Sequence, residues 1–410
     1  MSDFPAPAPA DAGAPPLKRP EFRRLLPISV TVALGYGMLI PVLPLYAESF
    51  GVGLAAIGLV QTVFGTTRFS FGLVGGLVVD RFGERASTLA GLLVVAASSY
   101  AAGFAQTFPQ LVAARGFGGA GSALFIAGLM NRILRIIEPE AMGRATGAFR
   151  SSFLVGIGAG PALGGLAAGR FGLAAPFHFY ATGLLIASAI TWFVMAGETA
   201  RQRVERSPLD ALRAARPLFS DFRYLLALAA TLAGWWAISG PAQNLGPVYA
   251  SSRLHLSQSE IGFATTLLAV GELMVLPVAG RAADLLGRRA VLVPSLAVMA
   301  LAIAALGRIE GLPWAYGVIM AAMGVGIGAS SVAAGALLAD AIPPGGSGAA
   351  VGVNQMAGDL GYLVSPTAIG AVAEQTSFAT AYLVAAAPGA IVALAALRRP
   401  DLPQHAAPAG

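Results

Sequence analysis

Four ionisable side chains lie inside long apolar stretches of this sequence, where charge is costly. Glu272 and Asp359 are acids, and Arg68 and Arg115 are bases. A carboxyl group in an apolar cavity can alternate between neutral and charged forms as its access to water changes. An arginine does not release its proton in a protein, so it can only bias a neighbour or bind an anion. These side-chain types favour a role in proton coupling, with Asp359 and Glu272 as the proton carriers. The structural alternative is that the four side chains only form polar contacts between helices.

The stretches that hold these residues are long enough to be membrane spans. Hydrophobic residues make up 56% of the 410 positions and charged residues 11%, against about a quarter in soluble proteins. Helices that cross about 30 Å of hydrocarbon are expected in two sets of six. They cover 25–50, 54–79, 86–106, 109–134, 144–168 and 176–196, and then 223–250, 259–284, 290–307, 313–338, 347–374 and 378–397. The expected fold is therefore an all-α membrane protein with twelve transmembrane helices.

The same reading divides the chain into two bundles joined by a linker. We expect a disordered, Pro/Ala-rich tail over 1–24, six-helix bundles over 25–196 and 223–397, a linker over 197–222 and a second tail over 398–410. Only Arg170, Arg253 and Arg308 fall in the loops opposite the N-terminal side. By the positive-inside rule, both tails and the linker are cytoplasmic, in a multi-pass protein of the cell (inner) membrane.

A charged loop occurs once in each half of the chain. "GGLVVDRFGERAS" (75–87) and "AGRAADLLGRRAV" (279–291) repeat the same Gly and Asp spacing, with Asp284 lying 204 positions after Asp80. Such a period indicates an internal duplication and a pseudo-symmetric fold. The loops resemble the signature of the major facilitator superfamily, in which they are thought to form a cytoplasmic latch between the halves, and Glu84 departs from the basic residue usual there. The matching residues are Gly76, Asp80, Arg81, Gly83 and Arg85, and then Gly280, Asp284, Gly287, Arg288 and Arg289.

Three stretches of the first half resemble the 12-helix drug:proton antiporter branch of this superfamily. They are "LGYGMLIPVLP" (34–44), "RGFGGAGSA" (115–123) and "GIGAGPALGG" (156–165). The prolines of the first stretch should interrupt its helix. The third matches the antiporter motif in full with Gly156, Gly160, Pro161, Gly164 and Gly165. Its small residues allow close helix contact, which would suit an interface helix as one half rocks against the other.

Other kinds of site have little support in the sequence. "GFGGAG" (116–121) fits a dinucleotide fingerprint by letter, but it lies within a spanning helix instead of after a strand. The three histidines lack ligand spacing, cysteine is absent and no catalytic triad can be assigned. We therefore expect no enzyme activity, metal or cofactor, with the proton as coupling ion. The basic charge follows from membrane topology, so no nucleic-acid partner is expected, and we expect a monomer.

The resemblance also implies where a substrate would bind. In this superfamily the first, fourth, seventh and tenth helices line the cavity, which points here to Tyr36, Phe125, Asn131, Trp235, Trp236, Gln243 and Asn244. Such a mixture suits a small amphipathic compound. The first helix has no central carboxylate, which favours a neutral or weakly anionic substrate over an organic cation. The expected function is proton-coupled export. The alternatives are an importer of a sugar or other metabolite and a non-transporting membrane sensor or scaffold.

Overall fold

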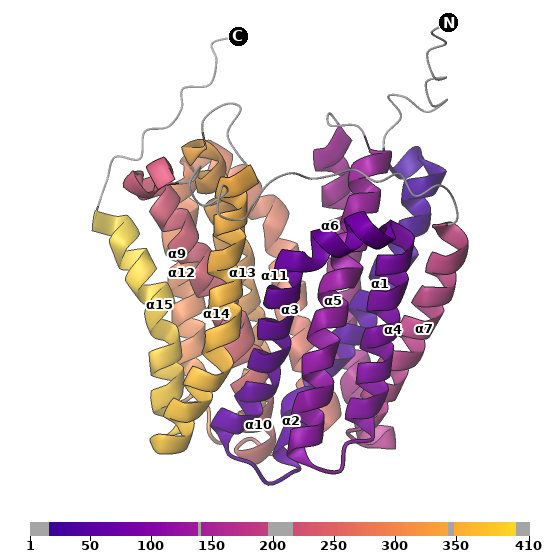
Figure 1. The fold of residues 1–410 in the computed structure, drawn as a ribbon. Coiled ribbons are helices and arrows are strands. Elements are labelled where there is room, and N and C mark those ends of the chain that lie inside the picture. The colour runs from indigo at the N-terminus through magenta and orange to yellow at the C-terminus, as the bar shows by residue number, and fades with distance from the viewer. Residues whose placement is uncertain (1–15, 138–140, 196–215, 343–347, 399–410) are drawn as a thin grey trace, which may run out of the picture.

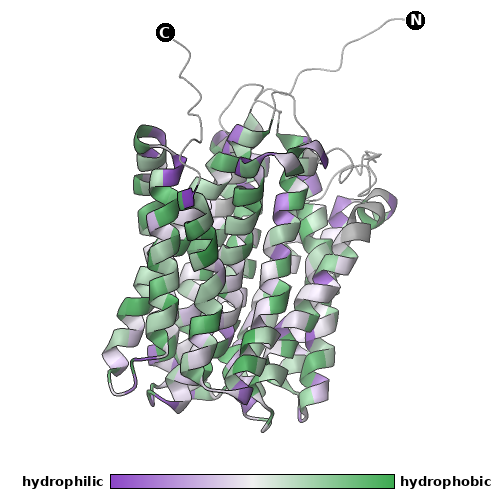
Figure 2. Ribbon diagram, turned by 90° about the vertical axis from the view of Figure 1, so that its left-hand side faces the viewer, coloured by the Kyte–Doolittle hydropathy of each residue, from purple (hydrophilic) through white to green (hydrophobic). Residues whose placement is uncertain are grey.

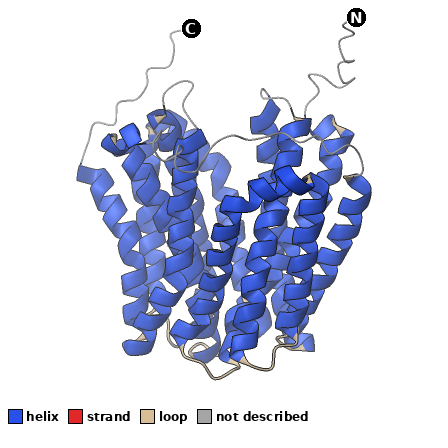
Figure 3. Ribbon diagram, in the orientation of Figure 1, coloured by secondary structure: helices blue, strands red, loops and turns tan. Residues whose placement is uncertain are grey.

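The computed structural model describes residues 16–137, 141–195, 216–342 and 348–398, and the regular elements in these ranges are helical, without a strand (Figure 3). The first half contains α1 (Pro20–Leu39), α2 (Val42–Glu48), α3 (Leu54–Phe82), α4 (Glu84–Gly103), α5 (Phe108–Ile136), α6 (Met142–Phe171) and α7 (Ala175–Val194). The second half contains α9 (Phe222–Ala237), η4 (Ile238–Leu245), α10 (Gly246–Ser252), α11 (Gln258–Leu286), α12 (Arg288–Leu306), α13 (Pro313–Ala341), α14 (Gly348–Gln375) and α15 (Phe378–Arg398).

The helices form two bundles that stand side by side (Figure 1). Buried apolar side chains fall into two clusters, one from the first half and one from the second. Leu45 and Val248 are the exceptions, because each packs into the cluster of the other half. With α1 and α2 counted as one span, and α9, η4 and α10 as another, the described residues form the expected two sets of six.

Within the residues that the structure describes, ten of these spans are long and apolar enough, by length and composition, to cross a membrane. Hydrophobic residues follow the helices, and hydrophilic ones gather toward the ends (Figure 2). The remaining two long helices are α3 and α14, which hold Gln61 and Arg68, and Asn354 and Asp359, respectively. These two helices pack against each other across the bundles.

The first and seventh spans are both interrupted by proline. α1 ends at Leu39, and Pro41 is the N-cap of α2, so the predicted interruption is confirmed. In the seventh span, the π-helical element η4 contains Pro241. Proline has no N–H group for the helical hydrogen-bond ladder, and a π-turn adjusts the backbone around such a gap.

The predicted N-terminal tail is too long at its C-terminal end. α1 begins at Pro20, and the side chains of Phe22 and Leu25 are almost fully buried in the first bundle. Burial of these apolar side chains stabilises the start of the helix, although the residues before it have a Pro/Ala-rich composition. Most of the predicted linker, and the tails 1–15 and 399–410, lie outside the described residues.

α1 begins and α15 ends at the same end of the molecule (Figure 1). We call this the terminal end, and the opposite one, where α2 and α10 lie, the far end. Because consecutive spans alternate in direction, α3 and α11 begin at the far end, whereas α6 and α14 finish there. These directions fix where along the molecule the two bundles touch.

Candidate functional site

The first seam between the bundles joins α3 to α14. The Thr62 hydroxyl donates a hydrogen bond to the Leu363 carbonyl (2.7 Å) and lies 2.9 Å from the Thr367 hydroxyl. Gly58 lies so close to Pro366 that a Cβ at this position would be 2.5 Å from the proline carbonyl oxygen. The absence of a side chain at Gly58 therefore allows two backbones to touch.

The second seam joins α6 to α11. The Ala162 N–H donates to the Thr266 hydroxyl (3.1 Å). A Cβ added to Gly165 would lie 3.0 Å from the Cα of Gly262. Close approach of two backbones again depends on glycine, as at small-residue interfaces between membrane helices.

Both seams lie toward the far end, because they use the first halves of α3 and α11 and the second halves of α6 and α14. Among the described residues, no hydrogen bond joins the bundles through α3 beyond Thr62 or through α14 before Tyr362. Gly352 and Gln355, which share the α3-facing side of α14, are exposed. The bundles are therefore closed at the far end and apart at the terminal end.

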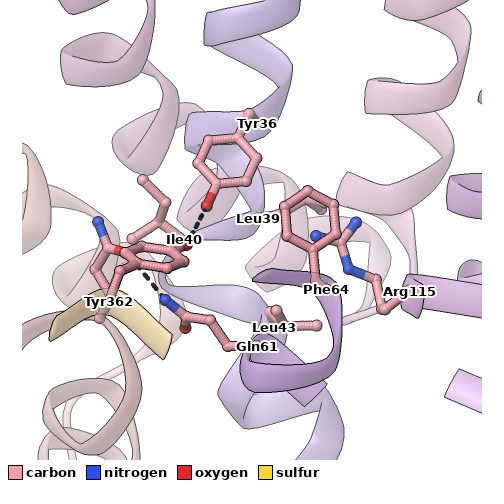
Figure 4. A pocket seen from close by; sticks show the side chains of 9 residues that line it. Tyr36, Leu39, Ile40, Leu43, Gln61, Phe64, Arg115 and Tyr362 are labelled. Carbon is pink, nitrogen blue, oxygen red and sulfur yellow. Dashed lines mark hydrogen bonds between the residues drawn. The ribbon is translucent and has the colours of Figure 1, made fainter. Parts of the chain in front are cut away.

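A small cavity lies where the seams give way to this opening. It is lined by Tyr36, Leu39, Ile40, Leu43, Gln61, Phe64, Arg115, Gln243 and Tyr362 (Figure 4). Two contacts cross it from one bundle to the other: the Tyr36 and Tyr362 hydroxyls lie 2.6 Å apart, and the side-chain amide of Gln61 donates to the side-chain oxygen of Gln243 at 3.5 Å. Both bundles thus contribute polar groups to a mainly apolar wall.

Arg115 is the charged residue of this cavity wall. Its side chain is 2% exposed, and its guanidinium carbon lies 4.4 Å from the centre of the Phe64 ring (Figure 4). Its Nε and Nη1 atoms are buried without a hydrogen-bond partner. A buried cation with free donors is a binding group for an anion.

Asp359 and Arg68 lie outside the cavity, near the point where the bundles part. Gly65 on α3 packs against Leu363 on α14. Arg68 lies one helical turn beyond that contact on α3, and Asp359 lies one turn beyond it on α14. Arg68 is exposed and Asp359 is half-buried, and Asp359 accepts a hydrogen bond from the Gln355 side chain (3.2 Å). They face the opening from opposite bundles without an ion pair.

Glu272 occupies a separate position on α11. It is half-buried, and its backbone packs against α13, where a Cβ on Gly328 would be 2.7 Å from the Glu272 carbonyl oxygen. At 100° per residue, Glu272 lies opposite Met274, which is 74% exposed on the outer surface. Glu272 therefore faces the interior, but the structure does not bring it into the Arg115 cavity.

The predicted cavity residues divide into two groups. Tyr36 and Gln243 line the cavity, and Trp235 packs edge-on against Tyr362 at 5.9 Å. The prediction is wrong for Phe125, which is 4% exposed inside the core of the first bundle. Asn131, Trp236 and Asn244 also lie outside the cavity lining. Helix number alone does not say which side of a helix faces inward.

Sequence reasoning missed Gln61, Phe64 and Tyr362. A signal was available for Gln61, because it is a polar residue within an apolar span. Tyr362 lies three positions after Asp359, so the two share one side of a helix. Phe64 gives no comparable signal, since phenylalanine is common in membrane spans.

The two repeated loops are built alike. Gly83 and Gly287 have φ angles of +83° and +93°, a region that a residue with a side chain rarely adopts. The following residue pairs with a helix of its own bundle in each loop. Glu84 binds Arg135 of α5 (2.9 Å), and Arg288 binds Asp340 of α13 (3.2 Å). The unusual acid at position 84 is thus matched by a base, with the charges exchanged between the halves.

The next arginine of each loop caps a neighbouring helix. Arg85 donates to the Trp192 carbonyl near the end of α7 (2.8 Å), and Arg289 donates to the Leu397 carbonyl near the end of α15. Arg288 also pairs with Asp284 (2.9 Å). These contacts of the described loop residues all stay within one bundle, and none of them joins the halves in this conformation.

The other residues of the loop signature make fewer contacts. Arg81 is exposed and lies 5.6 Å from the Phe82 ring centre, and Gly280 has open space beside it. The side chain of Asp80 and the surroundings of Gly76 lie outside the described part of the structure.

The α6 motif serves two interfaces. A Cβ on Gly156 would lie 2.8 Å from the Leu34 nitrogen, one on Gly160 would lie 2.5 Å from the Leu34 carbonyl oxygen, and Gly164 packs against Met38. These glycines therefore contact α1 inside the first bundle, which corrects the expectation that they serve the interface between halves. Pro161 and Gly165 of the motif do contact α11 across the second seam.

Comparison with known families gives the same architecture. The chain matches the Major Facilitator Superfamily over residues 25–253 and 241–410. The protein therefore belongs to the major facilitator superfamily. With its apolar spans and bacterial relatives, it is a multi-pass protein of the cell membrane.

Relatives in three bacteria carry names that refer to drug resistance. The chain is 24% identical to the multi-drug resistance efflux pump PmrA of Streptococcus pneumoniae serotype 4, over 83% of this chain and 86% of the relative. It is 29% identical to multidrug resistance protein 1 of Bacillus subtilis over 38% of this chain, and 26% identical to quinolone resistance protein NorA of Staphylococcus aureus over 36%. These last two alignments span only 40% and 38% of the relative.

Solved structures share the fold. The nucleoside transporter NupG superposes with a TM-score of 0.73 at 16% identity, over 93% of this chain and 99% of NupG. A bacterial homologue of the human lysosomal transporter Spinster gives a TM-score of 0.73 at 15% identity, over 92% and 94% of the two chains. At these identities, the likeness concerns architecture.

Proposed function

We propose that this protein is a proton-coupled antiporter that exports small amphipathic or hydrophobic compounds by alternating access. The observation that carries the proposal is the arrangement of the bundles, which are closed by glycine-packed seams at one end and apart at the other. Asp359 and Glu272 lie on inward sides of the helices that form these seams. The drug-resistance names of the relatives support export over uptake.

The orientation inferred from the arginines assigns the open end to the cytoplasm. In this conformation, the carboxyl group of Asp359 would release its proton to the cytoplasm and the substrate would enter. The bundles would then rock about the cavity, so that the seams part and the terminal end closes. Protonation from outside would accompany release of the substrate, and the proton would return inward with the carboxyl group.

The repeated loops suit a role in this exchange. In the present conformation, the ion pairs of Glu84 and Arg288 hold each loop rigidly against its own bundle. Closure of the terminal end would bring the two loops together. Rigid loops with preset charges can then serve as the latch between halves, because little ordering is required at the moment of contact.

The test uses purified protein in liposomes that contain a pH-sensitive dye. A quinolone, chosen from the name of one relative, is added across an imposed proton gradient. Proton flux that depends on the quinolone, together with quinolone movement against the proton flow, is expected. Movement of both in the same direction would identify an importer, and quinolone movement that is independent of the gradient would refute the coupling.

Variants then show which carboxyl group carries the proton. Asp359→Asn and Glu272→Gln are measured separately, and at least one should abolish gradient-driven transport while passive exchange of substrate persists. Glu310→Gln is the matched control, because Glu310 is an exposed carboxylate in the loop between α12 and α13. Full gradient-driven transport in both Asp359→Asn and Glu272→Gln would remove these carboxyl groups from the mechanism.

A further inference from the structure

Among the described residues, Arg115 is a buried cation without a matching partner, and the proton-coupling proposal assigns it no role. The side chain is 2% exposed, and two of its three guanidinium nitrogens are buried with no hydrogen-bond partner. The nine residues that line its cavity include no carboxylate. A buried charge is costly unless an opposite charge or several hydrogen bonds compensate it, and none of the cavity residues supplies the opposite charge.

Phe64 stabilises the cation without neutralising it. The guanidinium carbon lies over the ring, 4.4 Å from its centre, which is a favourable cation–π geometry. Such a contact uses the face of the aromatic ring and leaves the N–H donors unsatisfied. Guanidinium donors form a planar fork that matches the two oxygens of a carboxylate. The site therefore retains its capacity for an oxyanion.

The rest of the cavity combines apolar and neutral polar side chains, which suits an amphipathic ligand. Leu39, Ile40 and Leu43 provide an aliphatic wall from the first span, whereas Gln61 and Gln243 are neutral amides. A space of about 20 Å³ beside these residues has room for a group of roughly one water molecule. One oxygen of a small head group fits there, and the rest of the compound would extend toward the opening between the bundles.

We propose that the transported compound carries an anionic oxygen group, such as a carboxylate, and that this group pairs with Arg115 while the apolar part packs against the first span. The proposal rests on the proposed transport function, and it narrows the substrate class to amphipathic organic anions. It also gives Arg115 a partner that is present only when substrate is bound. Pairing would satisfy the free donors and offset the cost of the buried charge.

The experiment measures binding by the full-length protein in phosphatidylcholine nanodiscs, which contain no net-anionic lipid. The probes share one apolar body: naphthalene-2-carboxylate, naphthalene-2-carboxamide and 2-naphthyltrimethylammonium. We expect the carboxylate to bind at least tenfold more tightly than the amide, and the ammonium compound to bind most weakly. Repeating the titration with added phosphatidylglycerol tests whether an anionic lipid competes for the same group.

Variants connect this preference to one side chain. Arg115→Gln should bind the carboxylate and the amide equally, and retained binding of the amide shows that the cavity is intact. Arg115→Lys should restore part of the preference. Arg253→Gln is the control, because Arg253 is an exposed arginine 5.7 Å from the ring centre of Phe378 at the far end, and it should leave the preference unchanged.

Three results would overturn the proposal. The first is equal binding of carboxylate and amide by the unmodified protein, and the second is a carboxylate preference that survives Arg115→Gln. The third is competition by phosphatidylglycerol that removes the carboxylate signal, which would assign the site to anionic lipid instead of substrate. Because these titrations need neither a proton gradient nor transport, failure of the antiporter proposal would be seen separately in the liposome assay.

Discussion

A single methyl group at the α3–α14 seam should shift the balance between the two conformations. In Gly58→Ala, the new Cβ would lie 2.5 Å from the carbonyl carbon and oxygen of Pro366 and 2.6 Å from the nitrogen of Thr367. Ordinary C···O contacts begin at about 3.3 Å, so the helices must separate by about 0.8 Å. All the opposing atoms belong to the backbone, which cannot move aside as a flexible side chain could.

That separation also weakens the hydrogen bond next to it. The Thr62 hydroxyl to Leu363 carbonyl distance of 2.7 Å would increase to about 3.5 Å, beyond the usual range for O–H···O bonds. Overpacking of this kind typically costs about 1–3 kcal/mol. Because the conformation with parted seams avoids the clash, the population closed at the far end should fall by about 5- to 150-fold relative to the other.

Disulfide cross-linking at the other seam measures this population. A Cβ on Gly169 would lie 3.1 Å from the Ser259 hydroxyl oxygen, close to the roughly 3 Å between Cβ and the opposite sulfur of a disulfide. The double variant Gly169→Cys with Ser259→Cys should therefore cross-link in the closed conformation. The chain has no native cysteine, so no background thiol competes.

The cross-linking rate should fall in the Gly58→Ala background in proportion to the closed population. Gly72→Ala is the matched control, because Gly72 is on the same helix with nothing within 4 Å of its would-be Cβ. Both substitutions raise helix propensity by about 1 kcal/mol. A folded Gly58→Ala protein that cross-links as fast as Gly72→Ala would refute the reasoning that backbone contact at this seam sets the equilibrium.

Three further outcomes are expected. Gly156→Ala, which overpacks the first bundle internally, should lower the thermal unfolding midpoint at a cost of about 1–3 kcal/mol but leave the cross-linking rate unchanged; a changed rate would mean that the bundle does not move as one body. Tyr362→Phe removes the 2.6 Å contact with Tyr36 and should lower the ratio of closed to open protein about fivefold, as loss of about 1 kcal/mol requires; cross-linking should slow with it, so an unaltered rate would show that the contact does not stabilise closure. Glu84→Arg should lower the free energy of unfolding by the contribution of one ion pair, about 1 kcal/mol or less, and so lower the thermal unfolding midpoint. Adding Arg135→Glu should restore the midpoint. Additive losses in the double variant would contradict direct pairing.

The sequence was sufficient to predict the membrane architecture. Helix lengths follow from the thickness of the bilayer, and the duplication follows from the loops around Asp80 and Asp284. The interruption of the first span was predictable as well, because Pro41 lacks the required N–H group. These features depend on properties that repeat along the chain, so they can be read without knowing how the helices pack.

The candidate site was only partly predictable. Tyr36 and Gln243 were identified by helix number and polarity, but the same reasoning selected Phe125, which packs in a core. The residues that line the cavity with Arg115 come from both halves of the chain, and Phe64 resembles any other apolar residue in a span. Sequence patterns give the type of a side chain, whereas its neighbours depend on how each helix is rotated.

The sequence by itself determined that this protein crosses the membrane in two related six-helix sets and carries ionisable groups within them, because hydrophobic length and charge are local properties of the chain. The tertiary structure alone decided which end is closed, that Arg115 faces a cavity without an acidic partner, and that the glycines of α6 serve two different interfaces. These features arise from contacts between helices far apart in sequence, and a contact of that kind is set by how two surfaces fit together.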